Sequence, residues 1–88
     1  MPSSGSGATV EVRVELKPGV LDAEAESIQK SLGLLGIGHL TAVRTARVYT
    51  LVFHGVNPRA AEKLAAEAVD RLLANPVIHQ VRVQPAAK

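Results

Sequence analysis

Two segments near opposite ends of the chain alternate apolar and polar residues one by one. TVEVRVELK, at residues 9–17, places valines and a leucine on one face and charged residues on the other. VIHQVRV, at residues 77–83, alternates in the same way. A period of two is typical of a β-strand with one buried face. The first and last elements of the fold are therefore predicted to be strands of a sheet that is covered on one side.

Two amphipathic helices are predicted between these strands. Asp22 is a suitable N-cap for a helix over residues 22–35, in which apolar residues recur at helical spacing. Asn57 and Pro58 begin a second helix, whose apolar stripe continues to about residue 73. Asn at the N-cap followed by Pro is a strong start signal, because the missing N–H of proline costs nothing at that position.

The dipeptide Asn75-Pro76 joins the second helix to the last strand. Proline cannot continue the helix, and it restrains the residue before it to extended geometry. The helix must therefore end by about Ala74. We interpret the dipeptide as a structural hinge that needs no ligand.

The middle of the chain, residues 39–54, is rich in β-branched residues and is predicted to form two strands, 39–45 and 47–54. The turn between them would lie near Thr45-Ala46, where no Asn-Gly or Asp-Gly pair marks it. One long bent strand is the alternative. The predicted fold is α+β with the order β-α-β-β-α-β, an antiparallel sheet with two helices on one face.

The strand at 47–54 has two apolar rows. Tyr49, Leu51 and Phe53 point to one face, and a second row of Val48, Thr50 and Val52 points to the other. Loss of alternation indicates burial on both faces, although helices cover only one. We therefore predict a sheet-mediated oligomer with Tyr49, Leu51 and Phe53 at its interface. The chain has no cysteine, and a core this small contributes only about 3–5 kcal/mol, so association would also stabilise it.

Length and charge limit the other possibilities. The 88 residues suffice for one domain, predicted at 9–84 between a disordered tail at 1–8 and a short tail at 85–88. The net charge of +2 is spread along the chain without a basic stripe, which argues against a nucleic-acid partner. No apolar run is long enough to span a membrane, and the first eight residues lack a signal-peptide pattern, so a cytoplasmic protein is expected.

Side chains for chemistry are few and scattered. There is no cysteine and no Gly-x-Ser-x-Gly nucleophile motif. His39, His54 and His79 lack the short spacing of metal ligands. Glu24 and Glu26 complement the dipole of the first helix. No catalytic, cofactor-binding or metal site is therefore expected on this chain.

Two longer segments, VRVELKPGVLDAEAESIQKSLGLLG and LLANPVIHQVRV, resemble PurS, the small subunit of formylglycinamidine ribonucleotide synthase. The resemblance covers roughly residues 9–83. Both motifs occur in the same order and at similar spacing in a chain of similar length. The motif positions, to which we assign structural roles, are Lys17, Pro18, Gly19, Asp22, Asn75 and Pro76.

The resemblance implies a non-catalytic subunit of phosphoribosylformylglycinamidine synthase, a ligase complex of purine biosynthesis. PurS proteins bridge a large synthetase subunit, PurL, and a glutaminase subunit, PurQ, and support ammonia transfer between them. The complex uses ATP, magnesium and glutamine, with no cofactor on the PurS chain itself. The resemblance also implies dimers or tetramers formed through the sheet.

Two other classes of function remain open from the residues alone. A small ligand-sensing regulatory domain of the ACT type would also dimerise through its sheet, and it would bind a small molecule there. A stand-alone small hydrolase would need a phosphate-cradling loop after the first strand, and KPGVLD lacks one.

Overall fold

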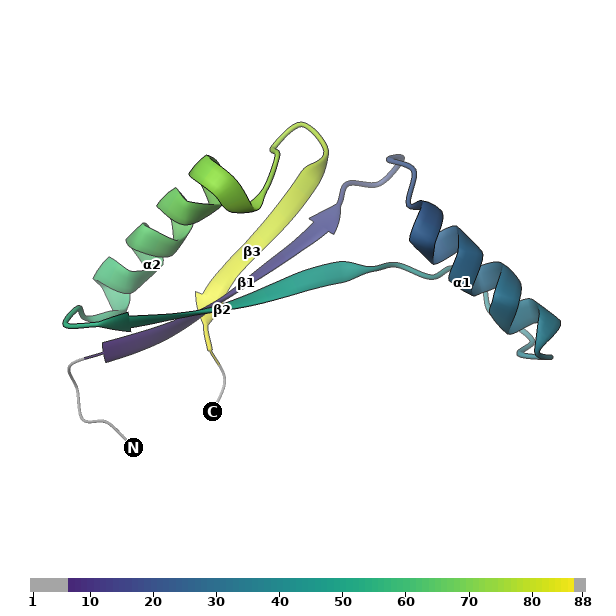
Figure 1. Ribbon diagram of the computed structural model, residues 1–88, viewed down its shortest axis with the longest axis horizontal. Helices are drawn as coiled ribbons and strands as arrows, with labels where there is room; N and C mark the ends of the chain where they lie inside the picture. Colours follow the sequence, from purple (N-terminus) through teal and green to yellow (C-terminus); the bar gives the residue numbers. More distant parts are fainter. Residues whose placement is uncertain (1–6, 87–88) are drawn as a thin grey trace.

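The computed structural model describes residues 7–86. Three strands and two helices alternate along the chain, and the second helix ends in a π-helical turn (Figure 1). The elements are β1 (Gly7–Leu16), α1 (Ala23–Leu34), β2 (Ala46–His54), α2 (Pro58–Ala68), the π-helical turn η1 (Val69–Leu73) and β3 (His79–Pro85).

The strands form one antiparallel sheet in the order β2-β1-β3. Val12, at its centre, lies opposite Tyr49 of β2 and Val83 of β3. The predicted strands at both ends of the chain are thus confirmed, and the structure shows that they are direct neighbours. Their apolar rows lie on the same face of the sheet, as the alternation predicts.

The second helix covers this apolar face. α2 packs against β1 and β3, and small residues on its inner side let it approach the sheet closely. Asn57 caps the helix, because its side-chain oxygen accepts a hydrogen bond of 2.8 Å from the Ala60 amide. The buried core is made of Val10, Val12, Val14, Ala61 and Ala65.

The middle segment forms one strand where two were predicted. Residues 39–45 pair with no strand and lead directly from α1 into β2. The chain does not reverse at Thr45-Ala46, where the sequence has no turn residue. The order β-α-β-β-α-β therefore fits the molecule with its two middle strands merged into one continuous segment, of which only the second half is paired.

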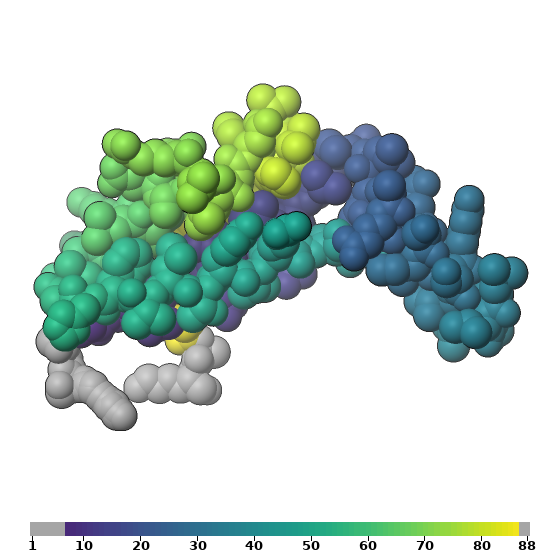
Figure 2. All heavy atoms as spheres, in the orientation of Figure 1, coloured from purple at the N-terminus to yellow at the C-terminus, as the bar shows by residue number. Residues whose placement is uncertain are grey.

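The prediction that two helices cover one face holds for α2 only. α1 and its connecting segments, residues 17–45, project beyond the end of the sheet (Figure 1), and we call these residues the arm. The space-filling view shows the arm as a separate lobe joined to the sheet at one end (Figure 2). The reason lies in residues 39–45, which continue the line of β2 past the sheet and hold the helix outside it.

The ends of the domain extend slightly beyond the predicted boundaries. β1 begins at Gly7, two residues before the predicted strand, and β3 continues to Pro85. The predicted tails otherwise fall at 1–6 and 87–88, outside the described residues. None of the helices within residues 7–86 is long and apolar enough to cross a lipid bilayer.

Candidate functional site

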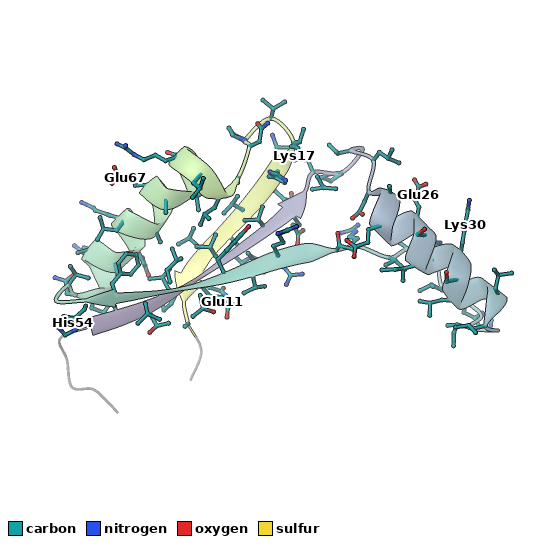
Figure 3. The ribbon with its side chains drawn as sticks, in the orientation of Figure 1. Glu11, Lys17, Glu26, Lys30, His54 and Glu67 are labelled. Carbon is teal, nitrogen blue, oxygen red and sulfur yellow. The ribbon has the colours of Figure 1, made fainter. Side chains whose placement is uncertain are left out.

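The two sequence motifs meet at one end of the sheet. The amide of Lys17, directly after β1, donates a hydrogen bond of 2.8 Å to the carbonyl oxygen of Ile78, directly before β3. Figure 3 shows Lys17 beside the start of β3. The segments KPG and NPVI, nearly 60 residues apart in the sequence, therefore form one surface. This surface is the candidate functional site.

The first part of this surface is a tight turn at Pro18-Gly19. The Val20 amide donates to the Lys17 carbonyl oxygen at 3.1 Å, and Gly19 has a φ of 89°. Proline followed by a residue with positive φ is typical of a type II turn, and glycine adopts that φ without strain. Pro18 and Gly19 thus form the turn that follows β1.

The second part is the turn at Asn75-Pro76, in which Asn75 makes hydrogen bonds from three of its groups. Its side-chain oxygen accepts from the Val77 amide at 2.9 Å, and its own amide donates to Nδ1 of His79 at 2.9 Å. Its carbonyl oxygen accepts from the amides of Ile78 and His79 at 3.1 and 2.8 Å. The turn satisfies its own polar groups, as expected of a hinge.

Asp22 joins the two connections of the arm to each other. One carboxylate oxygen caps α1 by accepting from the Ala25 amide at 2.9 Å, and the other accepts from the Thr45 hydroxyl at 2.7 Å. Hydrogen bonds from the Ala25 amide and from Thr45 lower the pKa of Asp22 below its usual 3.8. The start and the return of the arm are thereby tied together at its root.

Beside this root lies a hollow of about 290 Å³. It carries charges of both signs, Lys17 and Arg44 against Glu15 and Asp22. The hollow differs from a typical small-molecule site, which would have convergent polar groups in an apolar pocket.

The face of the sheet opposite α2 is a hydrogen-bonded polar layer on β1 and β3. Gln80 donates to Glu15 at 2.7 Å, Gln84 donates to Glu11 at 3.2 Å, and Arg13 forms an ion pair with Glu15 at 3.0 Å. The bonds from Gln80 and then from Arg13 lower the pKa of Glu15 below its usual 4.5. This carboxylate is therefore held in its ionised, structural form.

The two rows of β2 lie in different surroundings. Tyr49, Leu51 and Phe53 are half-buried and pack beside the core on the α2 side. Val48 and Val52 lie on the opposite face and are 50% and 77% exposed. The assignment of Tyr49, Leu51 and Phe53 to an interface between chains stays a prediction.

The histidines are dispersed over the molecule. His39 lies at the return of the arm with a φ of 64°, His54 ends β2 and His79 begins β3. Among the residues that the structure describes, no three His, Asp or Glu side chains come together as a metal-binding group.

Sequence reasoning missed the contacts that join distant segments. The bond between Thr45 and Asp22 and the bond between Gln80 and Glu15 each join segments that are far apart in the chain. Neither partner carries a local signal, because a polar residue next to a strand end is ordinary. Only the register of the sheet, which places Glu15 opposite Gln80, could have indicated one of them.

Comparison with known proteins identifies the family. The family model for PurS, phosphoribosylformylglycinamidine (FGAM) synthase, matches residues 9–87. The chain belongs to the PurS family. The phosphoribosylformylglycinamidine synthase subunit PurS of Methanothermobacter thermautotrophicus is 39% identical over 74 residues, 84% of this chain and 87% of the relative.

Solved PurS structures have the same fold. The crystal structure of Methanocaldococcus jannaschii PurS, a subunit of formylglycinamide ribonucleotide amidotransferase, aligns with a TM-score of 0.80 at 30% identity and covers 91% of this chain and 96% of that one. A chain of the PurLQS structure from Thermotoga maritima aligns with a TM-score of 0.81 at 22% identity, with coverages of 98% and 100%, and this match shows the fold alone. The predicted resemblance to PurS is confirmed, and the ligand-sensing alternative is not favoured.

Proposed function

We propose that this chain is a non-catalytic assembly subunit of phosphoribosylformylglycinamidine synthase. In this role it bridges the synthetase subunit, PurL, and the glutaminase subunit, PurQ, and supports the passage of ammonia between them. The single observation that carries the proposal is the family match over residues 9–87 together with PurS relatives of nearly equal length. The Thermotoga maritima structure is of a PurLQS complex, and we take its PurL and PurQ subunits as the kind of partner that this chain binds.

The chemistry of the side chains agrees with this role. A general acid or base needs a pKa brought toward neutrality by burial or by a like charge. The two carboxylates with shifted pKa values, Glu15 and Asp22, are both shifted downward by hydrogen bonds that hold the fold together. By the family resemblance, ATP, magnesium and glutamine are assigned to the partner subunits, and we assign the charged surface around Lys17 and Asn75 to contact with one of them.

Self-association is part of the proposal. The half-buried row of Tyr49, Leu51 and Phe53 is assigned to an interface between copies in a dimer or tetramer. A PurS oligomer would offer the same surfaces more than once, and this suits a subunit that has to hold two different partners.

The test is reconstitution of amidotransfer. PurL and PurQ of one organism are mixed with and without this chain, and glutamine-dependent formation of formylglycinamidine ribonucleotide is followed. We expect strong dependence on the chain, whereas ammonia-dependent formation by PurL should change far less. If the folded chain has no effect on competent partners, the bridging role is wrong.

A matched pair of variants locates the partner surface. Lys17→Glu reverses a charge at the candidate site, and Lys63→Glu reverses an exposed charge on α2. We expect the first to weaken reconstitution and the second to leave it unchanged. Equal effects of the two variants would overturn the assignment of this surface.

A further inference from the structure

The side chain of His79 closes the turn at Asn75-Pro76. Its ring nitrogen Nδ1 accepts a hydrogen bond of 2.9 Å from the Asn75 amide. The His79 amide in turn donates to the Asn75 carbonyl oxygen at 2.8 Å. One residue therefore holds the backbone of Asn75 at both its N–H and its carbonyl group. Of these two bonds, the one to the ring depends on the chemical state of a side chain.

The ring of His79 can accept this bond in one protonation state only. A backbone amide is always a donor, so Nδ1 has to supply its lone pair. In the neutral ring this places the proton on Nε2. In the charged ring both nitrogens carry protons, so two donors would face each other. Protonation of His79 therefore breaks the bond to the Asn75 amide.

Hydrogen bonds connect this turn to the candidate functional site. Ile78, directly before His79, donates its amide to the Asn75 carbonyl oxygen at 3.1 Å. The carbonyl oxygen of Ile78 accepts from the Lys17 amide at 2.8 Å. His79 itself lies opposite Leu16, the last residue of β1. Release of the Asn75 amide would therefore loosen the backbone at the point where the two motif segments form one surface.

The surroundings of His79 give a charged ring room to move. His79 lines a hollow of about 350 Å³ together with the carboxylates of Asp22 and Glu24, which would attract the charged ring. β2 contributes the positive charge of Arg47 to this hollow, and η1 contributes the apolar Leu73. The ring can thus leave the turn without entering the core of the protein.

Two more charged residues lie near the start of β3. Lys17 stands beside it (Figure 3), and Glu15 lines the same hollow, although its carboxylate accepts from Gln80 on the opposite face of the sheet. Hydrogen bonds lower the pKa values of Glu15 and Asp22, so both carboxylates stay ionised between about pH 5 and about pH 8. Histidine is the side chain that ordinarily changes its charge in this interval. A change of pH within it therefore leaves those two carboxylates unchanged.

We propose that His79 positions the candidate functional site and makes it sensitive to protons. The neutral ring holds the Asn75-Pro76 turn, and protonation releases the turn and weakens the contact of this surface with a partner subunit. The bond is present at the alkaline end of the interval in which histidine titrates and is lost toward its acid end. His79 acts through the backbone of Asn75, as a positioning residue. The inference rests on the proposed function, because it assigns a regulation to the same surface.

NMR of the isolated chain tests the bond itself. A scalar coupling across the hydrogen bond, between the Asn75 amide nitrogen and Nδ1 of His79, should be present at about pH 8 and absent at about pH 5. The protection of the Asn75 amide against hydrogen exchange, relative to its intrinsic rate at each pH, should fall roughly fivefold, as expected for the loss of one hydrogen bond. A coupling that is absent at pH 8, or one that persists in the charged ring, would overturn the inference. So would a ring that stays neutral down to pH 5.

Reconstitution with PurL and PurQ tests the consequence. His79→Asn keeps an acceptor near the place of Nδ1 but does not titrate, and His54→Asn, at the opposite end of the sheet, is the matched control. At each pH, the concentration needed for half-maximal amidotransfer is divided by that of His79→Asn, so that the pH responses of the partner subunits cancel. His79→Phe, which does not titrate either, is the reference if His79→Asn does not fold.

We expect this ratio to rise at least twofold from about pH 8 to about pH 6, both for the natural chain and for His54→Asn, since most ordinary histidines are charged at the lower pH. A natural chain that supports amidotransfer with a constant ratio overturns the inference alone. A chain that supports no amidotransfer at any pH, although its coupling is lost on acidification, overturns the proposed function and leaves the proton-sensitive turn in place.

Discussion

The sheet with α2 and the arm differ in how they use the same kind of sequence pattern. Both helices are amphipathic, and both are capped by a side chain that accepts from an amide three residues on, Asn57 in α2 and Asp22 in α1. α2 buries Ala61 and Ala65 of its stripe against the sheet, whereas α1 buries only Ala25. Local signals therefore decide where a helix begins, but they do not decide which surface covers it.

The difference follows from the connections. α2 reaches the sheet through a tight reversal after β2 and returns through the Asn75-Pro76 turn, so it must lie against β1 and β3. α1 returns through residues 39–45, which continue the line of β2 and allow no such reversal. The side chains of α2 also suit its position, because the small residues Ala61 and Ala65 allow close contact with the sheet.

The largest effect should separate the two regions directly. Val12, fully buried at the centre of the sheet, is replaced by Ala, and Ile28 of the arm is replaced by Ala. Val12→Ala should lower the free energy of unfolding by about 2 kcal/mol at any protein concentration, from lost burial and a cavity. Ile28→Ala should cost less than about 0.5 kcal/mol in dilute protein.

Urea denaturation at several protein concentrations measures both variants. The cost of Ile28→Ala should grow with concentration, because association stabilises the folded chain by mass action. The exposed Val52→Ala is the control, and its effect should be small at every concentration tested. A full cost of Ile28→Ala in dilute protein would mean that the arm is packed within one chain.

The next effect concerns the caps. Asn57→Ala removes the hydrogen bond to the Ala60 amide and should lower the free energy of unfolding by about 1 kcal/mol. Asn57→Asp keeps an acceptor at the same place and should recover most of the loss. Thermal unfolding measures both variants. If Asn57→Ala is neutral, α2 is held by burial alone and its cap is dispensable.

The sequence predicted the elements with strong local signals and missed those decided over a distance. Alternation located β1 and β3, and the Asn-Pro pairs located the start of α2 and the turn after it. Because the sequence has no turn signal near Thr45-Ala46, it did not decide whether residues 39–45 form a separate strand or run directly into the next one. The bond between Thr45 and Asp22, which ties the two connections of the arm together, is recorded by no local pattern.

A pH titration should sharpen the comparison at the root of the arm. The pKa of Asp22 is lowered, so its carboxylate stabilises the folded state above pH 3.8, and this contribution is lost as the pH falls through the lower, folded-state value. The protection of the Ala25 amide against hydrogen exchange, measured relative to its intrinsic exchange rate at each pH, should therefore fall in that acid range. Asp22→Asn keeps a capping oxygen and should remove the pH dependence. An unchanged acid response in Asp22→Asn would mean that another group controls the root.

The smallest effect is expected on the polar face of the sheet, opposite α2. This face is exposed, as the arm is. There the polar groups satisfy one another, whereas the arm exposes apolar groups that cannot. Gln80→Ala removes the largest cause of the lowered pKa of Glu15, so that pKa should rise toward 4.5, as NMR titration of the carboxyl carbon would measure. Gln84→Ala, which removes the neighbouring bond to Glu11, should leave the pKa of Glu15 unchanged. If Gln80→Ala also has no effect, Arg13 and Arg82 keep the pKa of Glu15 lowered without the bond from Gln80.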